Sequence, residues 1–200
     1  MFTDKLKNKM AEQASITPDT YYIEPIVRSK VNVYNLNFVI DPDKIVKSIL
    51  DYQVSHKKSN KSNVKAWHSK YALHNDTKDF DDLIKIVEDR VWHSLDQTKF
   101  RNFRIECVES WAIIYKKGDE TVRHKHSDQQ YSAVYYAKAE HNAAPIKFDN
   151  HLSIIPETGM LICFPGWLWH HVPKIVDDQE RICMSFNLNC VMTATNRDIV

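Results

Sequence analysis

The 200-residue chain lacks several features that would assign a protein to a class at once. It has no apolar run of the roughly 18–20 residues that a membrane span requires, and its first ten residues lack the apolar centre of a signal peptide. It also lacks an excess of charge of either sign, since 27 Lys and Arg residues offset 26 Asp and Glu residues. The net charge of +1 gives no electrostatic reason to expect a nucleic acid or a membrane as partner.

The four cysteines of the sequence lack the spacing of a zinc finger. All four lie in apolar stretches that are typical of β-strands: Cys107, Cys163, Cys183 and Cys190. We therefore interpret them as reduced core residues, and we expect the protein to be cytoplasmic, because reducing compartments keep thiols free.

The length suits one domain with a sizeable core, since a chain of this size buries roughly 70% of its unfolded surface. We expect a polar lead-in over residues 1–30 and a single domain over residues 31–200. Within it, residues 41–100 are expected to give helical support, and residues 103–190 read as short β-rich runs separated by turns. Helices followed by many short strands predict a mainly β fold, a double-stranded β-helix (jelly roll, cupin-like) with supporting N-terminal helices.

Individual elements can be placed from periodicity and capping residues. Asp41-Pro42 has the sequence of a helix start, and the apolar face of the helix that follows would be Ile45, Ile49, Leu50 and Val54. A second helix is expected over 81–95 and a strand over 31–40, while a short helix over 4–13 is expected in the lead-in. Residues 57–63 read as a loop.

The most informative feature is a His-x-His pair, His124 and His126, followed by a further histidine and an arginine. Residues two apart on a strand point to the same side, about 6.5–7 Å apart, so two such imidazoles can bind one metal ion. A third ligand from a distant strand would complete a facial set with open coordination positions, as an iron centre that binds O2 requires. An arginine after that ligand, Arg181, is suited to bind a carboxylate with its planar guanidinium.

Two features of this pattern leave alternatives open. His126-Ser127-Asp128 is a literal His-x-Asp, so the metal ligands could be His126, Asp128 and a third histidine instead of including His124. His170 and His171 are adjacent, and since neighbours on a strand point to opposite faces, only one of them can reach the metal.

At these residues the chain resembles the 2-oxoglutarate–Fe(II) oxygenase family found in marine bacteria and their tailed phages. Order and spacing agree across the following blocks: Trp111, Lys117-Gly118-Asp119, His124-Lys125-His126, Tyr131-Ser132-Ala133-Val134-Tyr135-Tyr136, Phe164-Pro165-Gly166-Trp167-Leu168-Trp169-His170-His171-Val172 and Arg181-Ile182-Cys183-Met184-Ser185-Phe186-Asn187. Cys183 departs from the family, which usually has Ser there, and so does Tyr131-Ser132-Ala133, where the family has Leu-Ser-Gly. A phage-encoded member would act in the host cytoplasm.

The resemblance implies an Fe(II)- and 2-oxoglutarate-dependent dioxygenase that uses O2 and releases succinate and CO2 while it hydroxylates an unactivated C–H bond. It implies His124, His126 and His170 as metal ligands and Arg181 as the residue that binds 2-oxoglutarate, with no catalytic residue beyond the metal centre. Ser185 and one of Tyr135 and Tyr136 are further hydroxyl donors to the same carboxylate.

The tryptophans near these blocks are interpreted as walls of the jelly roll: Trp111, Trp167 and Trp169. Two other functions remain open, which are a jelly-roll binding or structural module without turnover and a three-histidine dioxygenase that does not use 2-oxoglutarate. The substrate, a protein side chain or a small molecule, and the oligomeric state are not readable from the sequence.

Overall fold

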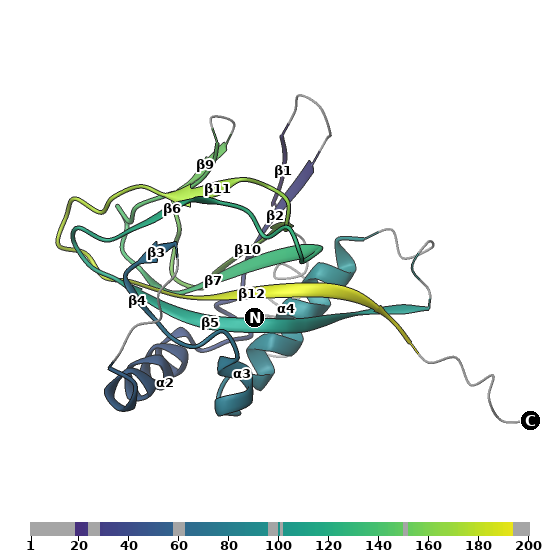
Figure 1. The fold of residues 1–200 in the computed structure, drawn as a ribbon, viewed down its shortest axis with the longest axis horizontal. Coiled ribbons are helices and arrows are strands. Elements are labelled where there is room, and N and C mark those ends of the chain that lie inside the picture. The colour runs from purple at the N-terminus through teal and green to yellow at the C-terminus, as the bar shows by residue number, and fades with distance from the viewer. Residues whose placement is uncertain are drawn as a thin grey trace, which may run out of the picture.

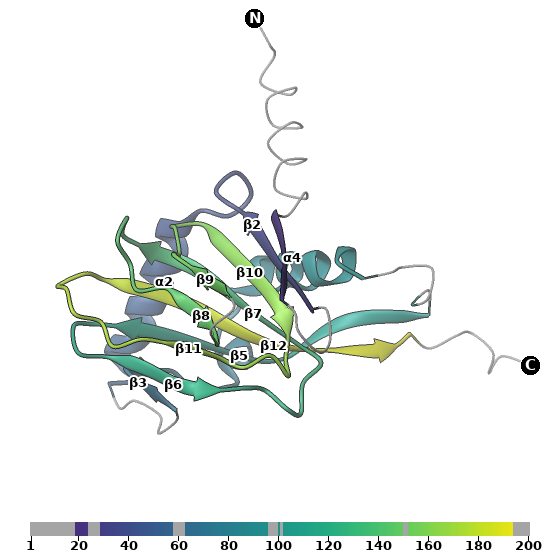
Figure 2. The same cartoon turned by 90° about the horizontal axis from the view of Figure 1, so that it is seen from above.

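The computed structural model describes residues 19–23, 29–57, 63–95, 100, 102–149 and 152–193. The helix expected over 4–13 and most of the loop expected over 57–63 lie outside these residues. In the described part of the chain, two antiparallel sheets lie face to face, and the helices cover the outer face of the larger sheet (Figure 1, Figure 2). No helix among the described residues is long and apolar enough to cross a membrane.

The two sheets divide the strands unequally. The larger sheet has the order β1 (Asp19–Ile23), β2 (Ser29–Asn35), β10 (Met160–Pro165), β7 (Tyr131–Ala139), β12 (Arg181–Met192), β5 (Phe103–Tyr115) and β4 (Trp67–His68). The smaller sheet has the order β3 (Val64–Lys65), β6 (Glu120–His124), β11 (His170–Val172), β8 (Ile146–Phe148) and β9 (Leu152–Ile154). The predicted mainly β fold with helices before the jelly-roll strands is therefore confirmed. Strand β1, within the expected lead-in, pairs with β2.

The central strands of the larger sheet are buried on both faces, and their side chains alternate between two cores. On β7, Tyr135 faces the helices while Val134 and Tyr136 face the smaller sheet. On β12, Met184 and its alternate neighbours likewise face the helices, while Cys183 faces the smaller sheet. This alternation leaves one face of each strand free to carry a site between the sheets.

Helix α2 (Pro42–Ser55) begins where the sequence predicts, since the Asp41 side chain accepts a hydrogen bond of 3.0 Å from the amide of Asp43 and Pro42 occupies the first turn. Its predicted apolar face is only half correct. Ile45 and Ile49 are buried against the sheet, but Leu50 is 39% exposed and Val54 is 70% exposed. The sheet covers only a narrow stripe of apolar side chains on the helix, so Leu50 and Val54, at the edge of the predicted apolar face, remain exposed to solvent.

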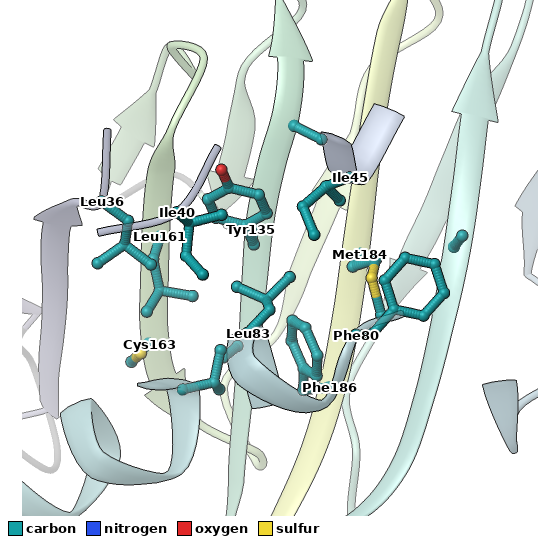
Figure 3. Packing of buried hydrophobic residues seen from close by; sticks show 14 of the residues in the cluster. Leu36, Ile40, Ile45, Phe80, Leu83, Tyr135, Leu161, Cys163, Met184 and Phe186 are labelled. Carbon is teal, nitrogen blue, oxygen red and sulfur yellow. The ribbon is translucent and has the colours of Figure 1, made fainter. Parts of the chain in front are cut away.

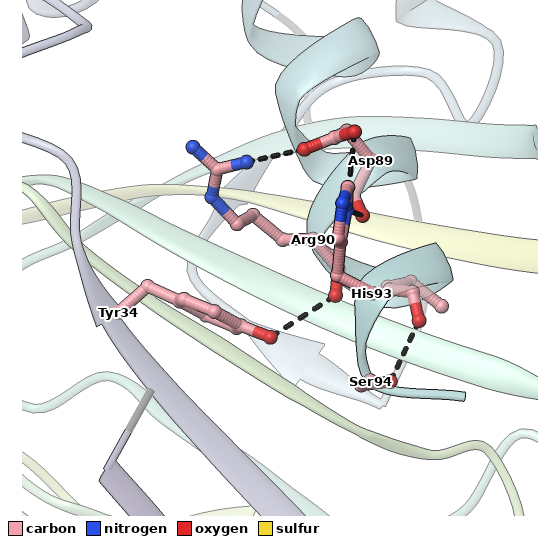
Figure 4. A network of polar contacts seen from close by, with 6 residues as sticks. Tyr34, Asp89, Arg90, His93 and Ser94 are labelled. Atoms are coloured by element: carbon pink, nitrogen blue, oxygen red, sulfur yellow. Dashed lines mark hydrogen bonds and ion pairs between the residues drawn. The ribbon is translucent and has the colours of Figure 1, made fainter. Parts of the chain in front are cut away.

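Helices α3 (Leu73–Asp76) and α4 (Asp81–His93) complete the outer layer. Figure 3 shows Leu83 and Phe80 packed with Ile45 over Tyr135 and Phe186 of the sheet. The end of α4 is bound to β2, because the Tyr34 hydroxyl donates a hydrogen bond of 3.0 Å to the carbonyl oxygen of Arg90 (Figure 4). The helices therefore support the outer face of the sheet whose inner face carries the site.

The unequal burial of two adjacent α2 residues predicts unequal effects on stability. Ile49→Ala should lower the free energy of unfolding by about 2–5 kcal/mol, because it removes a fully buried side chain and leaves a cavity. Leu50→Ala should cost about 1 kcal/mol or less, because its side chain is already partly in solvent. Urea denaturation of both variants measures the difference, and equal losses would contradict this packing of α2.

Candidate active site

Three histidines come together between the sheets. His170 on β11 lies directly opposite His124 at the end of β6, and their ring centroids are 4.2 Å apart. The ring of His126 lies 5.0 Å from that of His124 and 5.3 Å from that of His170. One nitrogen from each ring lies within 4.8 Å of the other two, so small side-chain rotations would let all three bind one divalent ion.

His126 reaches this cluster from a loop, since β6 ends at His124. The loop is fixed to the segment after β10, because the His126 amide donates to the carbonyl of Gly166 at 2.8 Å and the Gly166 amide donates to the carbonyl of Gln130 at 2.9 Å. The two segments pack so closely that a Cβ on Gly166 would lie 2.1 Å from the carbonyl oxygen of Gln129. Glycine at this position therefore permits the loop conformation that directs His126 toward its partners.

The imidazoles are held in a form suited to metal binding. Nδ1 of His124 lies 2.9 Å from the carbonyl oxygen of Val122, and Nδ1 of His170 lies 2.9 Å from that of Leu168. Each Nδ1–H can donate to its carbonyl, which leaves Nε2 as the lone-pair donor. Burial lowers the pKa of His124 and His170, and burial together with the nearby His124 lowers the pKa of His126 to about 4, so all three rings favour the neutral form.

The carboxylate alternative does not join this cluster. Asp128 lines the same cavity but is exposed, and it is not among the clustered potential ligand atoms in the described chain. His171, the neighbour of His170, pairs with Lys147 of β8 and is directed to the other face of the sheet. The residues brought together are thus His124, His126 and His170.

Arg181 is the largest fully buried side chain of the described chain, with 1% of its surface exposed. Its guanidinium carbon lies 4.5 Å from the ring centroid of Tyr115 and 4.9 Å from that of Tyr136, and its Nη2 donates to the Tyr136 hydroxyl at 3.2 Å. Nε and Nη1 have no hydrogen-bond partner within the described structure, and no described carboxylate pairs with this residue. Buried donors of a charged group are rarely left unpaired, so a carboxylate ligand would fit here.

The structure separates the two candidate tyrosines. Tyr136 lines the cavity beside Arg181, and burial raises its pKa, so its hydroxyl stays protonated and can donate. Tyr135 faces the helices instead, so Tyr136 is the one of the two tyrosines that faces the cavity. Ser185, half-buried on β12, also lines the cavity. Sequence reasoning missed Tyr115, whose position in the alternation of Trp111 and Ile113 on β5 could have indicated an inward side chain.

Strand register orders the floor of the cavity, which has a volume of about 370 Å³. Arg181 of β12 pairs with Tyr115 of β5 at one end, Ser185 pairs with Trp111 further along, and Asn187 pairs with Glu109 at the other end. Trp111 lies beside the histidines, since its ring centroid is 5.9 Å from that of His126. The candidate metal ligands therefore lie near the middle of the floor, and Arg181 lies at one end of it.

Only one of the three predicted wall tryptophans lies between the sheets. Trp111 is 5% exposed, whereas Trp167 and Trp169 are 46% and 36% exposed. Trp169 lies on the outer surface with the guanidinium carbon of Arg123 4.0 Å from its ring centroid. The interpretation of Trp167 and Trp169 as interior walls is wrong, because the residues around His170 alternate in direction and the tryptophans fall on the solvent side.

Comparisons with known proteins agree with this geometry. Residues 144–187, which include His170 and Arg181, match the family described as "Putative 2OG-Fe(II) oxygenase". A comparison with curated proteins finds no match for the chain.

Solved structures with the same fold are numerous and distant in sequence. A viral collagen prolyl hydroxylase from Paramecium Bursaria Chlorella virus-1, solved as a 2OG complex, has a TM-score of 0.60 at 15% identity, over 81% of this chain and 96% of its own. A prolyl hydroxylase from Trichoplax adhaerens has a TM-score of 0.62 at 15% identity, over 96% and 94%. HygX from Streptomyces hygroscopicus with iron bound has a TM-score of 0.55 at 9% identity, over 80% and 81%. The fold is thus the double-stranded β-helix of these oxygenases.

The cluster predicts which substitutions remove metal binding. His126→Ala and His124→Ala should each lower the affinity for Mn(II) by at least about 100-fold, since even the partners of metal ligands contribute about 10–100-fold. Asp128→Ala should keep the affinity within a few-fold, because its carboxylate lies outside the cluster. The free-Mn(II) electron paramagnetic resonance signal measures the three affinities. The opposite order for His124 and Asp128 would return the assignment to the His-x-Asp set.

Proposed function

We propose that the protein is an Fe(II)- and 2-oxoglutarate-dependent dioxygenase that hydroxylates an unactivated C–H bond. The observation that carries this proposal is that one cavity contains both the three-histidine cluster and a buried arginine with unpartnered nitrogens. The fold, the family match over residues 144–187 and the similar structures solved with iron or 2OG bound support it.

In this proposal His124, His126 and His170 hold the metal through their free nitrogens, and Arg181 binds the distal carboxylate of 2-oxoglutarate. When bound, iron, the 2-oxoacid and O2 supply the oxidising chemistry that yields succinate and CO2. Tyr136 positions the guanidinium and can donate its hydroxyl to the same carboxylate, while Ser185 offers a further hydroxyl. The apolar residues around the site exclude water, which strengthens these electrostatic contacts.

We further propose that the protein acts in the cytoplasm. All four cysteines are free, as expected of a cytoplasmic protein. The substrate is a small molecule or a protein side chain that enters the cavity. A prolyl hydroxylase among the similar structures was solved in complex with a peptide fragment, and HygX was solved with hygromycin B bound, so the fold accommodates ligands of both kinds.

The decisive experiment adds Fe(II) and 2-oxoglutarate to the protein without oxygen and records the visible spectrum. A weak charge-transfer band, followed by succinate formation when O2 is admitted, is the expected result. Oxygen uptake that is independent of 2-oxoglutarate would favour the three-histidine dioxygenase, and the absence of both band and uptake would favour a non-catalytic module.

The role of Arg181 gives a quantitative prediction. Removing one partner of a buried charge pair costs about 2–5 kcal/mol. Arg181→Ala should therefore weaken 2-oxoglutarate binding by roughly 30-fold to several-thousand-fold, at about 1.4 kcal/mol per tenfold. Arg181→Lys should restore only part of this, because an ammonium cannot make the paired contacts of a guanidinium. Titration of the charge-transfer band measures both variants, and parental affinity in Arg181→Ala would refute the assignment.

A further inference from the structure

Trp111, Ser132 and Asn187 belong to the sequence blocks that resemble the oxygenase family. The proposed function gives these three residues no part in binding the metal or 2-oxoglutarate. Ser132 and Asn187 lie at the end of the cavity that is remote from Arg181, and Trp111 lies between that end and Arg181. Asn187 of β12 pairs with Ser132 of β7 on one side and with Glu109 of β5 on the other. Asn187 lies six residue steps after Arg181 on β12, which is about 20 Å at about 3.3 Å per residue of strand. The cavity floor therefore has two distinct polar ends.

A chain of hydrogen bonds crosses the three strands at this end. The Ser132 hydroxyl donates to Asn187 Oδ1 at 3.0 Å, and Asn187 Nδ2 donates to Glu109 Oε2 at 2.7 Å. Ser132 and Asn187 are each 2% exposed. Because the hydroxyl occupies the amide oxygen, the amide NH2 group is directed at Glu109 and holds its carboxylate at the cavity wall.

The Glu109 carboxylate has free hydrogen-bond acceptor positions and no cationic partner among the described residues. It is half-buried, lines the cavity and forms no ion pair within the described residues. An ionised carboxylate has about four acceptor positions, and Asn187 occupies one. A partly buried carboxylate without a cation is best satisfied by a cationic donor, since charge-assisted hydrogen bonds are about twice as strong as neutral ones. Asp128 and Lys125 also line this cavity, and both are exposed, so their opposite charges offset each other.

Trp111 adds a donor two residues further along the same face of β5. Its side chain is 95% buried, it lines the cavity beside His126, and its Nε1 has no hydrogen-bond partner within the described structure. The indole can only donate, so its missing partner must be an acceptor. Residues two apart on one strand face lie about 7 Å apart, so one small ligand can contact both Glu109 and Trp111.

We infer that Glu109 and Trp111 bind the substrate of the proposed oxygenase, and that this substrate carries a protonated amino group with a hydrogen-bond acceptor a few atoms away. The amino group binds Glu109, and the acceptor, a carbonyl or hydroxyl oxygen, receives the Trp111 N–H. Asn187 and Ser132 are positioning residues for the carboxylate. The cavity lies near the lower end of the range of about 300–1,000 Å³ for small-molecule sites and is shared with 2-oxoglutarate, so the substrate is a small amine or one amine-bearing side chain.

The inference rests on the proposed function only in calling the ligand a substrate, and it is tested by binding. The protein is loaded with Zn(II) and 2-oxoglutarate, and ligand-observed NMR measures the affinity of three compounds of similar size. These are 2-aminohexanamide, which has both groups, hexanamide, which lacks the amine, and 1-aminopentane, which lacks the acceptor. We expect 2-aminohexanamide to bind at least tenfold more tightly than either of the other two.

Substitutions of Glu109 and Trp111 test whether these two residues cause the preference for 2-aminohexanamide. Glu109→Gln should remove the preference over hexanamide, and Trp111→Phe, which keeps an aromatic ring beside His126, should remove the preference over 1-aminopentane. Glu106→Gln is the matched control, because this exposed acid of β5 is paired with Arg104 and does not line the cavity. It should retain both preferences.

The outcomes separate the two proposals. Equal binding of the three compounds by the parent protein, no binding of any of them, or a preference that survives Glu109→Gln would overturn the inference. Binding of 2-oxoglutarate is read from its own resonances in the same samples. Its absence, with the amine preference retained, would overturn the proposed function and leave the amine site in place.

Discussion

The antiparallel pairing of β6 with β11 sets His124 directly opposite His170, and the rest of the candidate site is arranged around this pair. The close approach of Gly166 to the His126–Gln130 loop then brings His126 to the two paired rings. The backbone carbonyls of Val122 on β6 and of Leu168, just before β11, orient the rings of His124 and His170. A metal site built from sheet pairing is held by the fold itself, because moving one ligand by a residue would place its side chain on the opposite face.

Burial of Arg181 is the second constraint. A fully buried guanidinium without a carboxylate partner is costly, and contacts with two tyrosine rings and one hydroxyl offset only part of that cost. The arrangement is reasonable for a binding site that a dianionic ligand completes. The three-histidine set contains no carboxylate, so a divalent metal bound there would keep its full positive charge. Such a metal would also favour the binding of an anionic ligand.

Side chains on β5, β7 and β12 point alternately toward the helices and toward the cavity between the sheets. Residues facing the helices form an apolar layer, while their immediate neighbours carry the polar groups of the cavity. Because strand register aligns three strands, the polar groups fall at two ends, with Arg181 and its tyrosines at one and Ser132, Asn187 and Glu109 at the other. In the proposed function, a site with two such ends can bind a co-substrate and a substrate on opposite sides of the three-histidine cluster.

The fold class, the capped start of α2 and the group of histidines and arginine could all be predicted from the sequence, because these depend on local patterns and on spacing along one chain segment. Packing between distant segments was needed to show that His124 and not Asp128 joins the cluster, and that Tyr136 and not Tyr135 faces the cavity. It was also needed to show that Trp169 and Leu50 are partly exposed to solvent. Periodicity shows which residues share a face of a strand or helix. It does not show which neighbour covers that face, and pairing between distant strands, which brought Glu109 to Asn187, has no local signature.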